Sequence, residues 1–202
     1  MNTHIGRVCA SVAMAAGLGL VLAQSSNQQP QMTPEQQAEM EAYMKAGAPG
    51  PPHQMMAASA GSYELKVRSW SEPGGPATEE AGTAKRTMIL DGRVMLEEMT
   101  CSMMGMQFTG QGMMGFDNVS GKYWHTWNDS MSTGVMLSEG TCDAKQESCS
   151  FTGSFNDPIK KGPVKARTVR RKTGPMTEVF EMYGPDKSGK EMKMVEITYT
   201  RK

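Results

Sequence analysis

Residues 95–116 read MLEEMTCSMMGMQFTGQGMMGF, and the order of apolar and polar residues in this stretch decides the fold. Gly105 tolerates the positive φ that a two-residue hairpin turn needs, so we interpret Met104-Gly105 as such a turn. Side chains alternate along a β-strand between the two faces of the sheet. One face then carries five of the seven methionines with Cys101 and Phe108, and the other face is polar. This segregation predicts a half-buried antiparallel hairpin.

The register of this hairpin places residues whose numbers sum to 209 opposite each other. On the apolar face the opposed pairs are Met103 with Met106, Cys101 with Phe108, Met99 with Gly110, Glu97 with Gly112, and Met95 with Met114. Methionine is a flexible, polarizable filler of irregular interiors. We therefore interpret these methionines as the lining of a hydrophobic interior.

The rest of the chain extends the hairpin into a larger sheet. From Gly61 to Lys202, polar turns recur about every ten residues and separate about ten strand-like segments. Many short strands that are joined by hairpin turns without intervening helices indicate an all-β fold, an up-and-down antiparallel β-barrel. A β-sandwich is the alternative. The interior of such a barrel can hold a small ligand.

A helix is predicted before the barrel, in the segment TPEQQAEMEAYMKAG. Thr33 is a good N-cap, Pro34 suits the first helical position, and Gln36 completes a capping box. Gly47 marks the end, so the helix spans residues 34–46. Between it and Gly61 the sequence allows one further short helical piece.

The N-terminus has the features of a secretory signal, since Arg7 precedes an apolar stretch from Val8 that ends on the small residue Ala23. An uncleaved membrane anchor is the alternative, although this stretch is short for a bilayer span of about 20 residues. Cleavage after Ala23 predicts a secreted or periplasmic protein with no stable membrane span. The expected division is a signal peptide at 1–23, a linker and helical segment at 24–60, and a β-barrel domain at 61–202.

The charge balance limits the classes of partner. Without Arg7 the chain has 20 basic and 21 acidic side chains. A balance so close to zero argues against a surface for nucleic acid or anionic membranes. We also interpret the basic run KARTVRRK at 165–172 as a solvated strand face. The oligomeric state and any cofactor are not indicated by the sequence.

Three cysteines remain after signal cleavage. Cys142 and Cys149 flank a polar turn between two strand-like runs, and in an oxidising compartment we expect them to form a disulfide. Two separate thiols are the alternative. Cys101 is left over, and its place on the apolar face predicts that it is buried.

The register also predicts an interior polar site. Glu97 lies on the apolar face, opposite Gly112 and diagonal to Gly110, where missing side chains would open volume. A buried carboxylate needs a partner. If Phe116 opposes Tyr123, the next strand directs Tyr123, His125 and Trp127 into the same interior; a slip of the register would instead leave His125 on the surface. The predicted ligand-binding residues are Glu97, Gly110, Gly112, Tyr123, His125 and Trp127.

These residues predict a barrel that binds a small, mostly apolar molecule. One alternative is copper(I) handling by Cys101, Met103 and Met106, because soft sulfur ligands suit that ion. Another is an enzyme that uses Glu97 and His125 for acid–base chemistry. No nucleophile motif, zinc-ligand spacing or glycine-rich phosphate loop accompanies this pair, which disfavours catalysis.

Several stretches resemble the bacterial family known as domain of unknown function 1579. They include MTPEQQAEMEAYMKAGAPGPPHQMM, AGSYELKVRSW, DNVSGKY, MSTGVMLSEGT and EITYTRK, and the similarity runs from about Met32 to Lys202. The resemblance implies a domain without an assigned activity. The family usually has Trp where Tyr63 stands in Gly61-Ser62-Tyr63, and it lacks the cysteines found here.

The Gly-x-aromatic start also resembles that of lipocalin-like barrels, where an arginine near the last strand packs over the aromatic ring. In this sequence the resemblance assigns those structural places to Tyr63 and Arg201. It further implies that the N-terminal helical segment caps or flanks the barrel and that the interior is the binding site.

Overall fold

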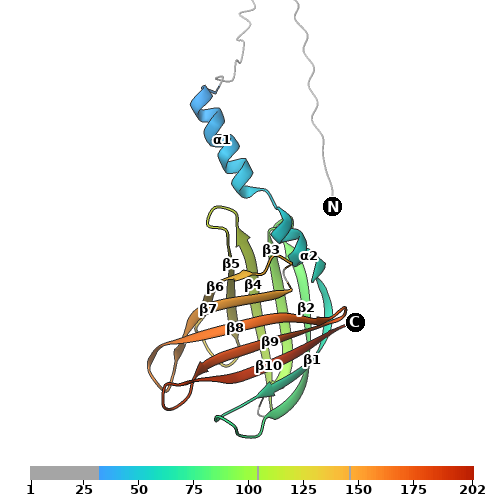
Figure 1. Cartoon of the computed structure of the whole chain (residues 1–202), viewed down its shortest axis with the longest axis vertical. Coiled ribbons are helices and arrows are strands. Elements are labelled where there is room, and N and C mark those ends of the chain that lie inside the picture. The colour runs from blue at the N-terminus through green and yellow to red at the C-terminus, as the bar shows by residue number, and fades with distance from the viewer. Residues whose placement is uncertain (1–31, 104, 146) are drawn as a thin grey trace, which may run out of the picture.

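The computed structural model describes residues 32–103, 105–145 and 147–202, and it shows a closed barrel of ten antiparallel strands (Figure 1). Each strand pairs with its neighbours in sequence, and the first pairs with the last. The strands are β1 (Gly61–Ser69), β2 (Thr78–Ile89), β3 (Val94–Met103), β4 (Met106–Asp117), β5 (Lys122–Asp129), β6 (Met136–Cys142), β7 (Ser148–Asp157), β8 (Gly162–Gly174), β9 (Thr177–Pro185) and β10 (Glu191–Arg201). The predicted up-and-down barrel is therefore confirmed, and the sandwich alternative is wrong.

The register that was read from residues 95–116 is also present. Met103 lies opposite Met106 and Glu97 lies opposite Gly112 in the β3–β4 pair. Gly105 has a φ of 74°, the left-handed conformation expected for the turn, while Met104 lies outside the described residues. The inward residues of these strands are mostly buried, as the alternation along a half-buried strand requires.

Both predicted helical pieces are present. Helix α1 (Pro34–Gly47) begins with the expected capping box at Thr33 and has no buried residue, because it projects away from the barrel (Figure 1). The barrel holds only its C-terminal end, through hydrogen bonds from Asn118 to the Ala46 carbonyl (2.8 Å) and from Arg93 to the Gly47 carbonyl (2.9 Å). No helix in the described part of the chain is long and apolar enough to span a membrane.

Helix α2 (Pro51–Ala58) lies over one end of the barrel (Figure 1). Met56 is only 2% exposed. It packs into an apolar cluster that we call the capped cluster, which contains Met56, Met95, Met114, Tyr123, Cys149 and Phe151. A second group, the basal cluster, lies in the interior further from α2. It contains Tyr63, Leu65, Val67, Ala84, Met99, Cys101, Phe108, Ile197 and Tyr199.

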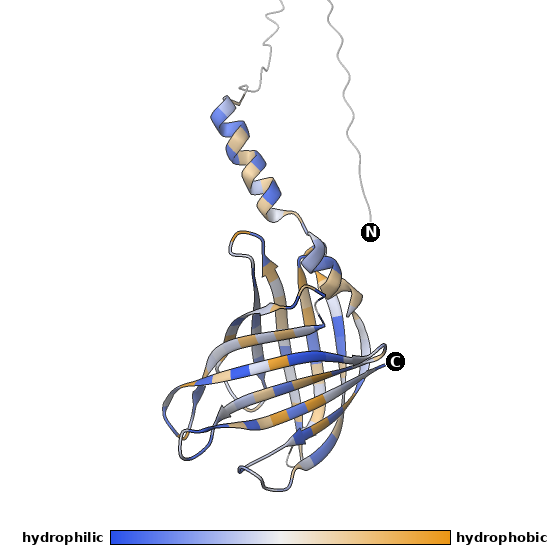
Figure 2. Ribbon diagram, viewed as in Figure 1, coloured by the Kyte–Doolittle hydropathy of each residue, from blue (hydrophilic) through white to orange (hydrophobic). Residues whose placement is uncertain are grey.

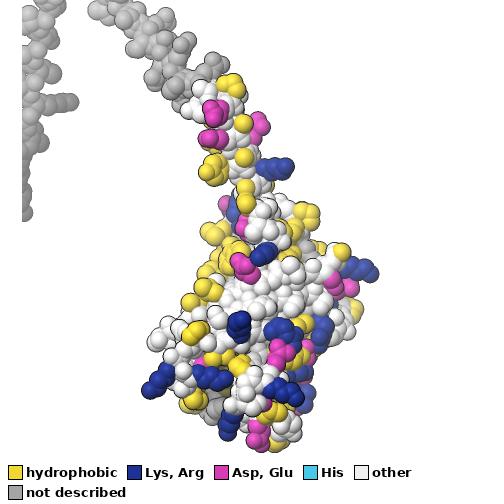
Figure 3. All heavy atoms as spheres, turned by 60° about the vertical axis from the view of Figure 1, so that its left-hand side comes forward, with side chains coloured by type: hydrophobic (Ala, Val, Ile, Leu, Met, Phe, Trp, Pro, Cys, Tyr) yellow, Lys and Arg dark blue, Asp and Glu magenta, His cyan; other side chains and the backbone are white. Residues whose placement is uncertain are grey.

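The outer face of the barrel is polar and carries both signs of charge. Hydrophilic and hydrophobic residues alternate along the strands (Figure 2), and basic and acidic side chains are interspersed on the surface (Figure 3). On β1 and β2, for example, Lys66 contacts Glu79 at 3.0 Å. Such pairs at a surface contribute about 0–1 kcal/mol each, so the interior decides the stability of the fold.

The predicted disulfide between Cys142 and Cys149 is present and joins directly opposed residues of β6 and β7, with 3.9 Å between the Cα atoms. Cross-linking a loop this short is worth about 2–3 kcal/mol by the chain-entropy relation. We expect the double variant Cys142→Ala/Cys149→Ala to lose this amount in urea unfolding. A reductant should destabilise the parent protein and leave the variant unchanged; equal sensitivity of both proteins would contradict the prediction.

Candidate functional site

A layer of polar side chains separates the two apolar clusters inside the barrel. On β2, Arg86 stands between Ala84 and Met88, and on β3 its direct partner Glu97 stands between Met95 and Met99. We call this the polar layer; it consists of Arg86, Glu97, His125, Arg170, Glu178 and Tyr199. These residues come from β2, β3, β5, β8, β9 and β10, so the layer runs around most of the barrel.

Arg86 is the centre of the polar layer, and its side chain is 0% exposed. Its Nε donates to Glu97 and its Nη2 donates to Glu178. The guanidinium also lies against two aromatic rings, 4.6 Å from the ring centre of Tyr63 and 4.5 Å from that of Tyr199. A buried charge is tolerated when it is both paired and hydrogen-bonded, and Arg86 meets both conditions through Nε and Nη2, while its buried Nη1 has no hydrogen-bond partner among the described residues.

Glu97 is held as a carboxylate. Burial by itself raises its pKa, but the charges of Arg86 and Arg170 outweigh burial. Hydrogen bonds from Arg86 and from the Tyr199 hydroxyl, the latter at 3.0 Å, act in the same direction. The pKa of Glu97 is therefore about 2. At neutral pH this carboxyl group carries no proton to donate.

His125 is held in its neutral form. Burial lowers its pKa first, the charge of Arg170 lowers it further, and Glu97 opposes the effect only in part, so the pKa is about 4. Its ring lies 6.3 Å from that of Phe151. The predicted inward orientation of His125 is thus observed, and the alternative of a slipped register is wrong.

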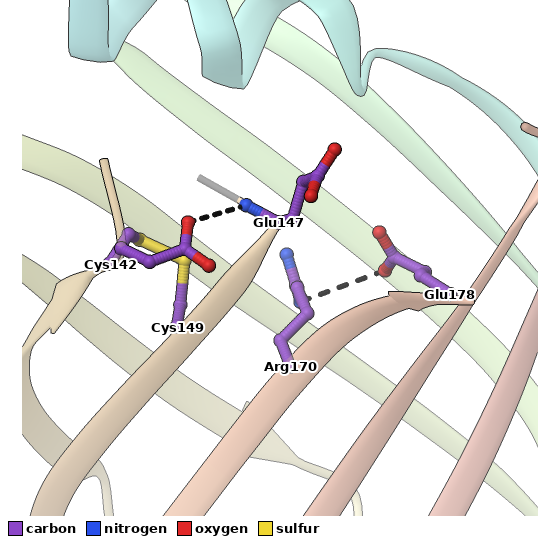
Figure 4. The surroundings of a disulfide bond; sticks show 6 residues. Cys142, Glu147, Cys149, Arg170 and Glu178 are labelled. Atoms are coloured by element: carbon purple, nitrogen blue, oxygen red, sulfur yellow. Dashed lines mark hydrogen bonds and ion pairs between the residues drawn. A yellow bond between two sulfur atoms is a disulfide. The ribbon is translucent and has the colours of Figure 1, made fainter. Parts of the chain in front are cut away.

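Arg170 differs from Arg86 because its donors are only loosely engaged. It points inward from β8, opposite Cys149 on β7 and Phe180 on β9. Figure 4 shows its side chain between the disulfide and Glu178. Its Nη2 is 3.6 Å from Glu97 and its Nε is 3.6 Å from Glu178, which is beyond hydrogen-bonding distance. Its side chain makes no hydrogen bond to any other described residue and is 17% exposed.

The structure brings the predicted site residues together, with one correction. Glu97, His125 and Trp127 meet around Gly112, and Tyr123 lies in the capped cluster. The expectation that the glycines leave open volume is wrong. A methyl group at Gly110 would lie 2.3 Å from the ring of Trp127, and one at Gly112 would lie 3.0 Å from both His125 and Trp127. The aromatic rings occupy the space beside these glycines.

Sequence reasoning missed four members of the polar layer: Arg86, Arg170, Glu178 and Tyr199. It required a partner for Glu97 without identifying Arg86. It also assigned the run 165–172 to a solvated face, which is wrong for Arg170, since Ala166, Thr168 and Arg170 alternate inward. The signal was available in KARTVRRK, where small residues alternate with charged ones. The face that carries Ala166 and Thr168 also carries Arg170, and it could have been assigned to the interior.

The structure agrees only in part with the lipocalin-like roles expected for Tyr63 and Arg201. The two residues lie opposite each other on β1 and β10. The guanidinium over the Tyr63 ring, however, is that of Arg86. Arg201 instead donates to the carbonyls of Ala58 (3.0 Å) and Ala60 (2.5 Å), so it fastens the end of α2 to the last strand.

The sulfur residues of the copper alternative lie at the far end of the barrel from α2. Met103 faces Met106 across the hairpin, and Cys101 is buried opposite Phe108. Burial raises the pKa of the Cys101 thiol, with a smaller contribution from Glu80, which disfavours the thiolate form that binds metal. Within the described part of the chain, no group of three or more His, Cys, Asp or Glu side chains is placed to hold a metal ion.

Two hollows on the outer surface lie apart from the polar layer. The larger, of about 500 Å³, is bordered by outward residues of β1 to β3, including Lys85, Glu98 and Thr100. The smaller, of about 400 Å³, lies beside Trp70 and Asp186. Both are open to solvent, whereas the polar layer gathers buried charged side chains inside the barrel, so the interior is the better candidate site.

Comparisons with known proteins identify the family. No curated protein matches this chain. One similar solved structure is a crystal structure of a conserved protein of unknown function with a hot dog fold from Alicyclobacillus acidocaldarius, at 10% identity, 81% coverage of this chain, 83% coverage of that chain and a TM-score of 0.20. A TM-score this low carries no argument about fold or function. A family model matches residues 48–201, and the chain therefore belongs to the family described as Protein of unknown function (DUF1579).

Proposed function

We propose that this protein is a secreted or periplasmic barrel that binds a small, mostly apolar molecule in its interior. The observation that carries the proposal is that several inward side chains at and below the polar layer are only half-buried: His125, Trp127, Arg170 and Phe180. A closed barrel of ten strands has a wider interior than one of eight, which side chains can just fill. A ligand inside the barrel would cover the surface that these side chains leave exposed.

The proposed contacts are the predicted residues with revised roles. Trp127 and Tyr123 provide aromatic surface, His125 provides a neutral hydrogen-bonding ring, and Gly110 and Gly112 let these rings lie close to the sheet. Glu97 is engaged by Arg86 and Tyr199, so it orders the polar layer. The disulfide suits an oxidising compartment, which supports export by the predicted signal peptide.

Tryptophan fluorescence offers a direct test, because the three tryptophans lie on different faces of the sheet. Trp127 points inward over Gly110, whereas Trp124 points outward over Gly115 and Trp70 packs near Lys193 on the outside. Titration with a brominated alkane, which quenches only at short range, should quench Trp127. We expect Trp127→Phe to lose most of the quenching and the matched variant Trp124→Phe to keep it.

Equal quenching in both variants would place the bromoalkane on the outer surface and contradict the proposal. Native mass spectrometry of the protein purified from the periplasm of its own host provides an independent measurement. A mass released on mild denaturation should be an organic molecule of low polarity.

Copper(I) handling is a second candidate because Met103 and Met106 face each other beside Cys101. A copper-sized adduct that persists under reducing conditions would support it, and a failure to compete for copper(I) under those conditions would remove it. For an enzyme that uses Glu97 and His125, the ionised state of Glu97 at neutral pH leaves only His125 to exchange a proton. Since the pKa of His125 is about 4, its ring is neutral as well, so at neutral pH the pair offers a base without an acid.

A further inference from the structure

We infer that the ligand carries one uncharged hydrogen-bond acceptor, of the carbonyl class, and that this acceptor lies against Arg170 in the polar layer. The inference rests on the proposed interior binding site and specifies the chemistry that this site selects.

Arg170 is the donor with capacity to spare. A guanidinium has five N–H donors. Both carboxylates near Arg170 are 3.6 Å away, while Arg86 already holds each of them by a hydrogen bond. The Arg170 side chain keeps 17% of its surface exposed, so an incoming acceptor can reach its N–H groups without displacing Arg86. The half-buried ring of His125 offers a further polar contact in the same layer.

The charge of the layer selects an uncharged acceptor. The guanidinium groups of Arg86 and Arg170 are matched by the carboxylates of Glu97 and Glu178, and burial keeps His125 neutral. The charges therefore sum to zero before any ligand enters. A carboxylate ligand would add an unmatched buried negative charge, and an ammonium ligand would add a positive one. A carbonyl oxygen accepts from Arg170 and leaves the balance unchanged.

The surroundings of the layer require the rest of the ligand to be apolar. On the side of α2 lies the capped cluster, including Tyr123 and Phe151. On the other side lies the basal cluster, with Trp127 and Phe180 packed against it. A ligand that contacts both clusters must therefore carry its acceptor between two apolar parts, at the level of Arg170. Internal ketones, esters and amides have this arrangement.

A series of ligands with equal chain length tests this selection. The purified mature protein is first saturated with the neutral fluorophore N-phenyl-1-naphthylamine, which is then displaced at pH 7.5 by undecane, 6-undecanone, undecanoate or undecylamine. A hydrogen bond from a charged donor predicts that the ketone binds about tenfold or more tightly than the alkane. The acid and the amine should bind more weakly than the ketone.

Substitution of Arg170 assigns the preference to this residue. In Arg170→Met the ketone should bind no more tightly than the alkane, whose affinity should stay within about twofold of the parent value. Arg167→Met is the matched control, since Arg167 lies on the same strand, faces outward and pairs with Glu191 at 2.7 Å. It should retain the full preference. If the methionine variant fails to fold, Arg170→Gln provides a second variant of lower charge and should reduce the preference.

The outcomes separate this inference from the proposed function. Tighter binding of undecanoate than of the ketone, or equal affinities for ketone and alkane, would overturn the inference while leaving an apolar binding site in place. Failure of the fluorophore and of all four ligands to bind would overturn both. Retention of the ketone preference in Arg170→Met would show that another group holds the acceptor.

Discussion

Replacing Arg86 by methionine is expected to lower the free energy of unfolding by about 3–5 kcal/mol. The substitution removes the donor that both Glu97 and Glu178 share, and it leaves two buried carboxylates close to each other with only Arg170 to offset them. Methionine roughly conserves the volume between the rings of Tyr63 and Tyr199, so lost packing adds little. The cost arises from unpaired charge.

Urea unfolding of the parent and the variant at pH 7 measures this effect. Arg167→Met is again the matched control, because it breaks an exposed ion pair with Glu191 and should change the free energy of unfolding by about 0–1 kcal/mol. A loss of similar size in both variants would show that Arg86 contributes no more than a surface charge. Combining Arg86→Met with Glu178→Gln should recover part of the loss, since the remaining Glu97 carboxylate is then matched by Arg170.

The stability of the barrel is expected to fall as the pH drops from about 6.5 to 4, and His125 is the cause. The pKa of His125 is about 4 in the folded protein against an ordinary value of 6.5. The unfolded chain therefore binds this proton at a higher pH than the folded chain, which favours unfolding as the pH falls through this window. The full difference corresponds to about 3 kcal/mol.

The variant His125→Gln isolates this contribution. Glutamine cannot take up the proton, so the free energy of unfolding should change much less between pH 7 and pH 4 than in the parent protein. Below about pH 4.5 a second loss is expected in both proteins, because the pKa of Glu97 is about 2 in the fold and its ion pair with Arg86 is lost on protonation. An unchanged slope between pH 7 and pH 4 in the variant would show that His125 titrates at its ordinary pKa.

The hairpin at residues 95–116 shows how much of the fold the sequence determines. Alternation has a period of two, so a register error of one residue would have exposed Met95, Met99 and Met114 together. The apolar pattern therefore admitted one register, and the structure has it. The pairing of Phe116 with Tyr123 across the next loop was conditional, since a slip there would have put His125 on the surface. The structure has this pairing, with His125 and Trp127 inside.

The polar layer could not be predicted to the same extent, for a physical reason. Glu97 was identifiable because it stands among apolar residues on its own strand. Its partner Arg86 comes from β2. The second carboxylate that Arg86 binds is Glu178 on β9, which lies 81 positions from Glu97 along the chain. Local alternation on one strand says nothing about which distant side chains meet across a closed barrel. In β8, where arginines occur on both faces, alternation does not even decide which arginine is inside.

The closure of the barrel between β1 and β10 has a consequence for the order of folding. Every other strand pair joins neighbours in sequence and can form as a local hairpin, whereas Tyr63 meets Tyr199 only when the two ends of the domain come together. Contacts of long sequence separation require the largest loss of chain entropy before they contribute stability. During folding, the charges around Arg86 therefore stay open to water until the last eleven-residue strand has paired. A chain in which that strand is still unpaired has an uncovered edge on β1 and another on β9, and it is the form most exposed to pairing with another molecule.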